Sequence, residues 1–174
     1  MSSPETQTDR PGVGDEQFRV PKVKVDVDLT LEDGLRVRGA VHLLPLAGVH
    51  AGRERVIDLL TAPDPHFLPV AITDRVQLVH KTRIILVSLG SPEDAGLLAG
   101  NEEEETAETV MVEVELAGLP SEMRRVTGLI YLRMPPGQRR VIDYLNQPDS
   151  FFPLQTGGGL VLVNKAYILD VFQP

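Results

Sequence analysis

The residues best suited to chemistry lie in two segments that read almost alike. They are RVIDLLTAPDPHFLPV (55–70) and RVIDYLNQPDSFFPL (140–154). Asp58 and Asp143 could act together in acid–base hydrolysis if the two carboxylates met in one cleft. Alternatively, each aspartate pairs with an arginine three residues earlier on the same helical face, Arg55 or Arg140. We favour local pairing, because most of the repeated residues are apolar. The sequence therefore assigns no catalytic residue.

Four repeated cations form a second candidate site. They are Arg55, Lys81, Arg140 and Lys165. Guanidinium and ammonium groups bind phosphates and carboxylates, so this set could hold a nucleotide or another small anionic ligand. Arg53 and Arg83 could extend a basic face in the first half of the chain. The alternative is that the two lysines are turn residues between strands.

Other kinds of site find little support in the sequence. The histidines His42, His50, His66 and His80 show no metal-ligand spacing. Without cysteine, the chain has no thiolate nucleophile and no Cys-based zinc site. The triple glycine at 157–159 precedes a strand pattern, so it predicts a hairpin turn rather than a phosphate-binding loop. We expect no metal, no cofactor and no enzymatic activity.

Composition limits the partners and the fold class. The net charge of −8 argues against binding to nucleic acids or anionic membranes, which both need a positive surface. No apolar run approaches the roughly 18–20 residues that span a bilayer, and the polar N-terminus lacks the apolar region of a secretory signal. We expect a cytoplasmic protein. Because aromatic residues are only 5%, the core must be built from Val, Leu and Ile, which favour strands.

The two halves of the chain align with each other. Gly52–Val87 matches Gly137–Val171 with a single one-residue gap and 15 identities. The identical pairs are Gly52/Gly137, Arg55/Arg140, Val56/Val141, Ile57/Ile142, Asp58/Asp143, Leu60/Leu145, Pro63/Pro148, Asp64/Asp149, Phe67/Phe151, Pro69/Pro153, Leu78/Leu162, Val79/Val163, Lys81/Lys165, Ile84/Ile168 and Val87/Val171. Unrelated segments of this length would share far fewer residues. We infer an internal duplication.

Hydrophobic periodicity predicts the elements of each repeat. VKVDVDLTL (23–31) alternates strictly, and VMVEVEL (110–116) alternates in the same way, so both predict half-buried strands. In the motif after 140, Val141, Tyr144 and Leu145 have helical spacing, and Asn146 is a plausible helix stop. Each repeat therefore reads as two strands, a short helix and two or three further strands.

Paired positions mark the register of the first two strands in each repeat. Asp28 should face Arg38, and Glu115 should face Arg125, across two hairpins. Two glycines at matching mid-strand places, Gly39 and Gly128, predict a bulge or a sharp bend.

These repeats resemble known small β-barrels. Their layout is similar to SH3-like and Sm-like barrels, and their motif resembles a poorly characterised bacterial domain family with an Arg-x-x-Asp-x-Leu-Asn motif and an Asn-Lys-x-x-Ile ending. The second repeat keeps Arg140, Asp143, Leu145, Asn146, Asn164, Lys165 and Ile168. The first keeps Arg55, Asp58, Leu60, Lys81 and Ile84, with Thr61 and His80 in place of the asparagines. The resemblance covers most of 20–174 and implies no known activity.

We therefore predict a mainly β protein made of two tandem small β-barrel-like repeats, each with one short helix, related by a pseudo-twofold axis. The predicted parts are a disordered tail (1–17), repeat 1 (18–89), an acidic flexible linker (90–108) and repeat 2 (109–174). In the motif, Asp58, Asp143, Asn146 and Asn164 are expected to be structural.

The expected function is that of a non-enzymatic adaptor or assembly module. Small barrels commonly serve as binding scaffolds, so we expect a protein partner, of which a second copy of the chain is one example. Apolar outward positions such as Leu129, Val161 and Leu169 could pack one repeat against the other or against that partner.

Overall fold

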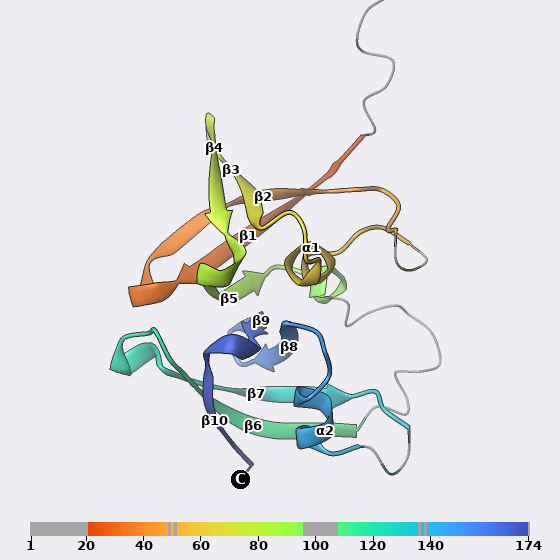
Figure 1. Ribbon diagram of the computed structural model, residues 1–174, viewed down its shortest axis with the longest axis vertical. Helices are drawn as coiled ribbons and strands as arrows, with labels where there is room; N and C mark the ends of the chain where they lie inside the picture. Colours follow the sequence, from red (N-terminus) through yellow and green to blue (C-terminus); the bar gives the residue numbers. More distant parts are fainter. Residues whose placement is uncertain are drawn as a thin grey trace, which may run out of the picture.

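The structure is a computed structural model that describes residues 21–48, 50, 52–95, 108–135, 137 and 139–173. Over these residues the chain forms ten strands, all paired antiparallel in one continuous sheet, and two short α-helices (Figure 1). The prediction of a mainly β protein is confirmed.

The elements follow the order expected from the periodicity. The strands of the first half are β1 (Val23–Leu31), β2 (Arg36–Leu43), β3 (Phe67–Ile72), β4 (Arg75–His80) and β5 (Ile84–Leu89). Those of the second half are β6 (Glu108–Leu116), β7 (Arg125–Leu132), β8 (Phe151–Thr156), β9 (Gly159–Asn164) and β10 (Ile168–Phe172). The α-helices are α1 (Val56–Thr61) and α2 (Val141–Leu145), and the 3-10 helices are η1 (Glu32–Gly34), η2 (Lys81–Arg83), η3 (Pro92–Ala95), η5 (Ser121–Met123) and η6 (Lys165–Tyr167).

The sheet shows the same strand order twice. Its full order is β10-β6-β7-β8-β9-β5-β1-β2-β3-β4, so β5-β1-β2-β3-β4 in the first half corresponds to β10-β6-β7-β8-β9 in the second. The halves join where β5 pairs with β9. A twofold axis would place β5 beside its own counterpart, β10. The join is head-to-tail instead, so the predicted pseudo-twofold relation is not found there.

Local sequence accounts for the register of the hairpins. In β1, Val25, Val27 and Leu29 are buried while Lys24 and Asp26 are exposed, as the alternation predicts. Asp28 lies opposite Arg38, with Arg38 Nε donating to the carboxylate over 2.7 Å. Glu115 lies opposite Arg125 in the second hairpin in the same way. Both predicted charge pairs are confirmed.

Gly39 and Gly128 mark points where the backbone of a neighbouring strand comes close. A Cβ on Gly39 would lie 2.5 Å from the Ala71 carbonyl oxygen, and one on Gly128 would lie 2.5 Å from that of Gln155. Real Cβ atoms do not tolerate this distance, so only glycine fits. The predicted mid-strand irregularity is therefore a close backbone approach from β2 to β3 and from β7 to β8.

Each half has a hydrophobic core, and the two cores exchange side chains at the join. The first core includes Phe151, Leu160 and Leu162, which come from β8 and β9 of the second half. The second core includes Ile85 and Leu86 from β5 of the first half. In β9, Leu160 and Leu162 point into the first core and Val163 into the second, because side chains alternate across a strand. In β5, Ile84 and Val87 point into the first core, whereas Ile85 and Leu86 point into the second. The halves share both a sheet and their apolar interior.

Polar contacts reinforce the join between the halves. The Asp33 amide donates to the Gly118 carbonyl over 2.7 Å, which ties η1 to the turn before η5. The Tyr167 hydroxyl lies 2.6 Å from the Thr82 carbonyl oxygen and 3.0 Å from the Glu32 carboxylate.

The segment predicted as a flexible linker begins as ordered structure. Pro92–Ala95 forms η3, in which Asp94 and Ala95 are buried and Arg53 pairs with Asp94 at 2.8 Å. Burial raises the pKa of Asp94, and the Arg53 guanidinium opposes that change. Residues 96–107 and the predicted tail 1–17 lie outside the described residues.

Candidate functional site

Asp58 caps the helix in which it lies. Its Oδ2 accepts from the Arg55 amide at 2.8 Å and from Arg55 Nε at 3.0 Å, while Oδ1 accepts from Arg55 Nη2 at 2.8 Å. The carboxylate thereby satisfies a backbone N–H that the first turn of α1 leaves without a helical partner. Asp58 therefore pairs locally with Arg55, which is the interpretation favoured from the sequence.

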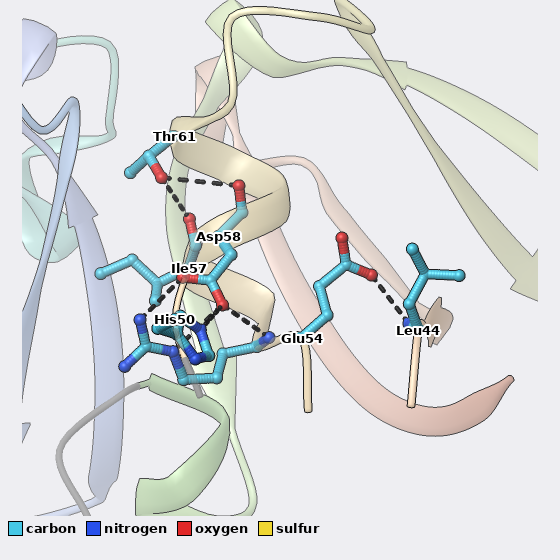
Figure 2. A network of polar contacts seen from close by, with 7 residues as sticks. Leu44, His50, Glu54, Ile57, Asp58 and Thr61 are labelled. Atoms are coloured by element: carbon cyan, nitrogen blue, oxygen red, sulfur yellow. Dashed lines mark hydrogen bonds and ion pairs between the residues drawn. The ribbon is translucent and has the colours of Figure 1, made fainter. Parts of the chain in front are cut away.

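His50 adds a contact to Asp58 that the sequence did not indicate. Its Nε2 lies 2.7 Å from Asp58 Oδ2, and Figure 2 shows the ring beside the carboxylate at the start of α1. The histidine comes from the loop before the helix, eight residues upstream, where no periodicity links it to Asp58. Figure 2 also shows the neighbouring loop contact, in which Glu54 accepts from the Leu44 amide at 2.8 Å.

Asp143 repeats the arginine pairing in α2. Arg140 Nε and Nη2 donate to its two carboxylate oxygens at 2.7 and 2.9 Å. The hydrogen bond to Asp143 raises the pKa of the Arg140 guanidinium. Each motif aspartate therefore binds the arginine that precedes its own helix. These hydrogen bonds of Arg55 and Arg140 stabilise the start of the helix.

We expect Asp58→Asn to destabilise the protein and to change its acid sensitivity. Burial alone would raise the pKa of Asp58, but the hydrogen bonds from Arg55 and His50 outweigh it and hold that pKa below its usual value of 3.8. A lowered pKa stabilises the folded state above pH 4, and this contribution is lost as the pH falls through the folded-state value. The variant should lose about 1–2 kcal/mol of unfolding free energy at pH 7, and the difference from wild type should shrink below pH 4. Urea denaturation followed by circular dichroism measures both effects.

Asp143→Asn is the matched control for that experiment. Asp143 lacks a histidine contact in its described interactions and is more exposed than Asp58, so its loss should be smaller. Equal losses from the two variants at pH 7 would contradict the assigned role of His50 and burial at Asp58.

Lys81 and Lys165 close the far end of each helix. Lys81 Nζ donates to the Ala62 carbonyl and Lys165 Nζ to the Gln147 carbonyl, each over 2.9 Å. These carbonyls follow the last helical turn and have no helical partner, so an ammonium group satisfies them. Burial lowers the pKa of both lysines, and the carboxylates of Asp64 and Asp149 oppose that change.

Asn164 links the two halves of the sheet. Its Nδ2 donates to the Ile84 carbonyl over 2.8 Å, and its Oδ1 accepts from the Ala166 amide. His80 occupies the matching place in the first half, where its Nδ1 accepts from the Thr82 amide at 3.4 Å. The asparagine predicted to be structural thus binds across the join. Asn146 is the C-cap of α2, as predicted.

The four candidate cations do not converge on one cavity. Arg55 and Lys165 line a cavity of about 180 Å³ at the join, together with Arg133, Tyr144 and Asp149. Lys81 lines a different cavity of about 260 Å³ beside Asn164, and Arg140 lines neither. Over the described residues, no group of three or more His, Asp or Glu side chains is arranged to hold a metal ion.

The two end strands of the sheet carry exposed apolar side chains. We define the β4 edge as Val76 and Leu78 of β4 together with Phe67, which begins the neighbouring β3, and the β10 edge as Leu169, Val171 and Phe172. All of these are exposed except Val171, which is half-buried. Of the outward residues predicted from the sequence, Leu169 is exposed, whereas Leu129 and Val161 are half-buried. β4 and β10 are the two ends of the strand order, and Figure 1 shows β4 in the upper half of the molecule and β10 in the lower half.

Sequence reasoning did not name Leu78 as an outward residue, and the repeat does not distinguish it from its identical partner Leu162, which is buried. The available signal was the alternation within RVQLVH, which places Val76 and Leu78 on the same face of one strand. An unpaired strand with apolar side chains can accept another strand through its free N–H and C=O groups.

Comparisons with protein families, with curated proteins and with solved structures find no match to this chain. Among the described helices, none is both long and apolar enough to cross a membrane.

Proposed function

We propose that this protein is a non-enzymatic assembly module that binds a protein partner at the open edges of its sheet. We further propose that its two halves arose by duplication and act as two joined small barrels. The repeated order of five strands and the aligned motif support that origin.

The observation that carries the proposed function is the exposure of apolar side chains on both end strands. Val76 and Leu78 lie on β4, and Leu169 and Phe172 lie on β10. Strand addition at an edge combines main-chain hydrogen bonds with pockets for alternate side chains. An apolar edge strand that is never covered would promote aggregation. A specific partner that covers these edges explains why the exposed apolar side chains are tolerated.

The alternative proposal is a regulatory module that binds a nucleotide or another small anion. It is supported by the cavity at the join, where Arg55 and Lys165 come together. Against it, the Arg55 guanidinium is engaged by Asp58 and the Lys165 ammonium by the Gln147 carbonyl. An anion would have to compete with these bonds. A hydrolase built on Asp58 and Asp143 has still less support, because each carboxylate is occupied by its own arginine.

Site-specific photo-crosslinking in the native cell tests the assembly proposal. A photoreactive amino acid is placed at position 78, at position 169, or at position 46 as a control. Leu46 is 76% exposed but lies in the loop between β2 and α1, away from both edges. We expect discrete protein crosslinks from 78 and 169 that are absent from 46. The same yield from all three positions, or none from the edges, would rule out the proposed function.

A further inference from the structure

Residues of the β4 edge match residues that are buried at the join. Phe67 is 48% exposed, whereas its identical partner Phe151 is 2% exposed. Leu78 is 63% exposed, whereas its identical partner Leu162 is 0% exposed. Val76, at 62%, matches Leu160 at 3%. Phe151, Leu160 and Leu162 are the three side chains that β8 and β9 insert into the first core. The β4 edge is therefore a second example of that inserting surface, and its apolar side chains are exposed in the described part of the chain.

The first core receives those three side chains beside β5. Beside β10, the counterpart of β5 in the second half, the second core is only partly covered. Ile84, Val87 and Leu60 are fully buried in the first half. Their identical partners in the second half, Ile168, Val171 and Leu145, are only half-buried. The β10 side of the molecule therefore repeats the receiving surface of the join, and none of the described strands inserts side chains there.

We propose that the partner at these edges is a second copy of this chain, whose β4 pairs antiparallel with β10 and inserts Phe67, Val76 and Leu78 against the second core. This inference rests on the proposed function and names its partner. Each molecule offers one inserting edge and one receiving edge, so the contact is head-to-tail. Contacts of this type build rings if the rotation closes and filaments if it does not.

The pairing at the join predicts the register of this contact. In the join, Val87 lies opposite Leu162, Leu86 opposite Val163 and Ser88 opposite Val161. The matching intermolecular pairs are Val171 with Leu78, Asp170 with Val79 and Phe172 with Gln77. Leu78 would thus take the buried place that Leu162 occupies within the chain.

Polar groups fit the same register. Asn164 donates to the Ile84 carbonyl across the join while its other amide atom caps η6. His80 caps η2 through Nδ1, so Nε2 is the ring nitrogen left to donate to the matching carbonyl, that of Ile168 in the receiving copy. Asp170 stands where the join has Leu86, so the contact between chains is more polar than the join. We therefore expect reversible, concentration-dependent assembly.

Two variants that each disable one edge test the proposal. Leu78→Asp removes the inserting edge, and Leu169→Asp removes the receiving edge; both residues are exposed, so the fold should persist. Wild-type protein should form species larger than the 19.1 kDa monomer as its concentration rises in multi-angle light scattering. Each variant alone should associate at least about 30-fold more weakly, as expected for a central interface residue. An equal mixture should form a dimer of one chain of each kind and nothing larger, because one intact inserting edge meets one intact receiving edge.

Two control variants separate a loss of assembly from a loss of folding. Leu46→Asp changes an exposed leucine away from the edges and should assemble like wild type. Val76→Asp replaces Leu78→Asp if circular dichroism shows that the latter does not fold. A wild-type chain that stays monomeric at about 100 µM, about a hundredfold above a micromolar dissociation constant, or a mixture that forms no dimer, overturns the inference. If crosslinks from position 78 then reach a different protein, the proposed function stands and only the identity of the partner is wrong.

Discussion

Phe151→Ala is expected to lower the free energy of unfolding by about 3–5 kcal/mol, the usual range for deleting a buried phenylalanine ring. Phe151 begins β8 in the second half of the chain, but its ring is buried in the core of the first half. The substitution leaves a cavity at the join between the halves. Urea denaturation followed by circular dichroism, in dilute solution, measures the loss.

The chain supplies its own control for this experiment. Phe67 is the identical residue of the first repeat, lies at the start of β3 and is about half exposed. Its ring packs edge-on against His80 at 4.9 Å between centroids, so Phe67→Ala should lose only about 1 kcal/mol. Equal losses from the two substitutions would mean that the join does not bury Phe151 as described. The Phe67 variant should in addition weaken the proposed assembly.

Gly128→Ala is expected to destabilise the protein by about 2–3 kcal/mol, in the range of overpacked interiors. The added Cβ would lie 2.5 Å from the Gln155 carbonyl oxygen and 2.8 Å from the Leu154 side chain. Because the nearest atom belongs to the backbone, β8 itself would have to move away from β7. Gly39→Ala meets the Ala71 carbonyl in the same way and should behave alike.

Gly157→Ala is the control for the two glycine substitutions. Gly157 lies in the β8–β9 turn, and a Cβ there would meet nothing within 4 Å. Its free energy of unfolding should stay within about 0.5 kcal/mol of wild type. Thermal and urea unfolding of the three variants measure these differences in stability. A Gly128 variant as stable as the Gly157 variant would show that β7 and β8 are farther apart than described.

Local pattern was enough to predict most elements of this protein. Alternation over 23–31 predicted β1 at its observed bounds, and the spacing of Val141, Tyr144 and Leu145 predicted α2. The pairing of Asp58 with Arg55 was also predictable, because the two residues are three positions apart in one helix. All of these features depend on contacts between neighbours in sequence, or on a side-chain period that can be read along a single strand.

Features that join distant segments were not predictable in this way. The predicted pseudo-twofold relation is not confirmed, and the head-to-tail pairing at the join was not predictable, because hydrophobic period shows which face of a strand is buried but not which strand lies beside it. The contact of His50 with Asp58 was likewise missed, since the loop that brings them together has no periodicity.

Leu78 and Leu162 separate the features that can be predicted from the sequence from those that depend on tertiary structure. The sequence by itself determined that both leucines lie in a strand after the same motif, on the same face, because an alternating strand encodes its own faces. Only the tertiary structure decided that β5 covers Leu162 while Leu78 stays exposed at the end of the sheet. The burial of Leu162 depends on β5, a neighbouring strand more than 70 residues away in the chain. The six residues of β4 or of β9 carry no pattern that indicates which strand will lie beside them.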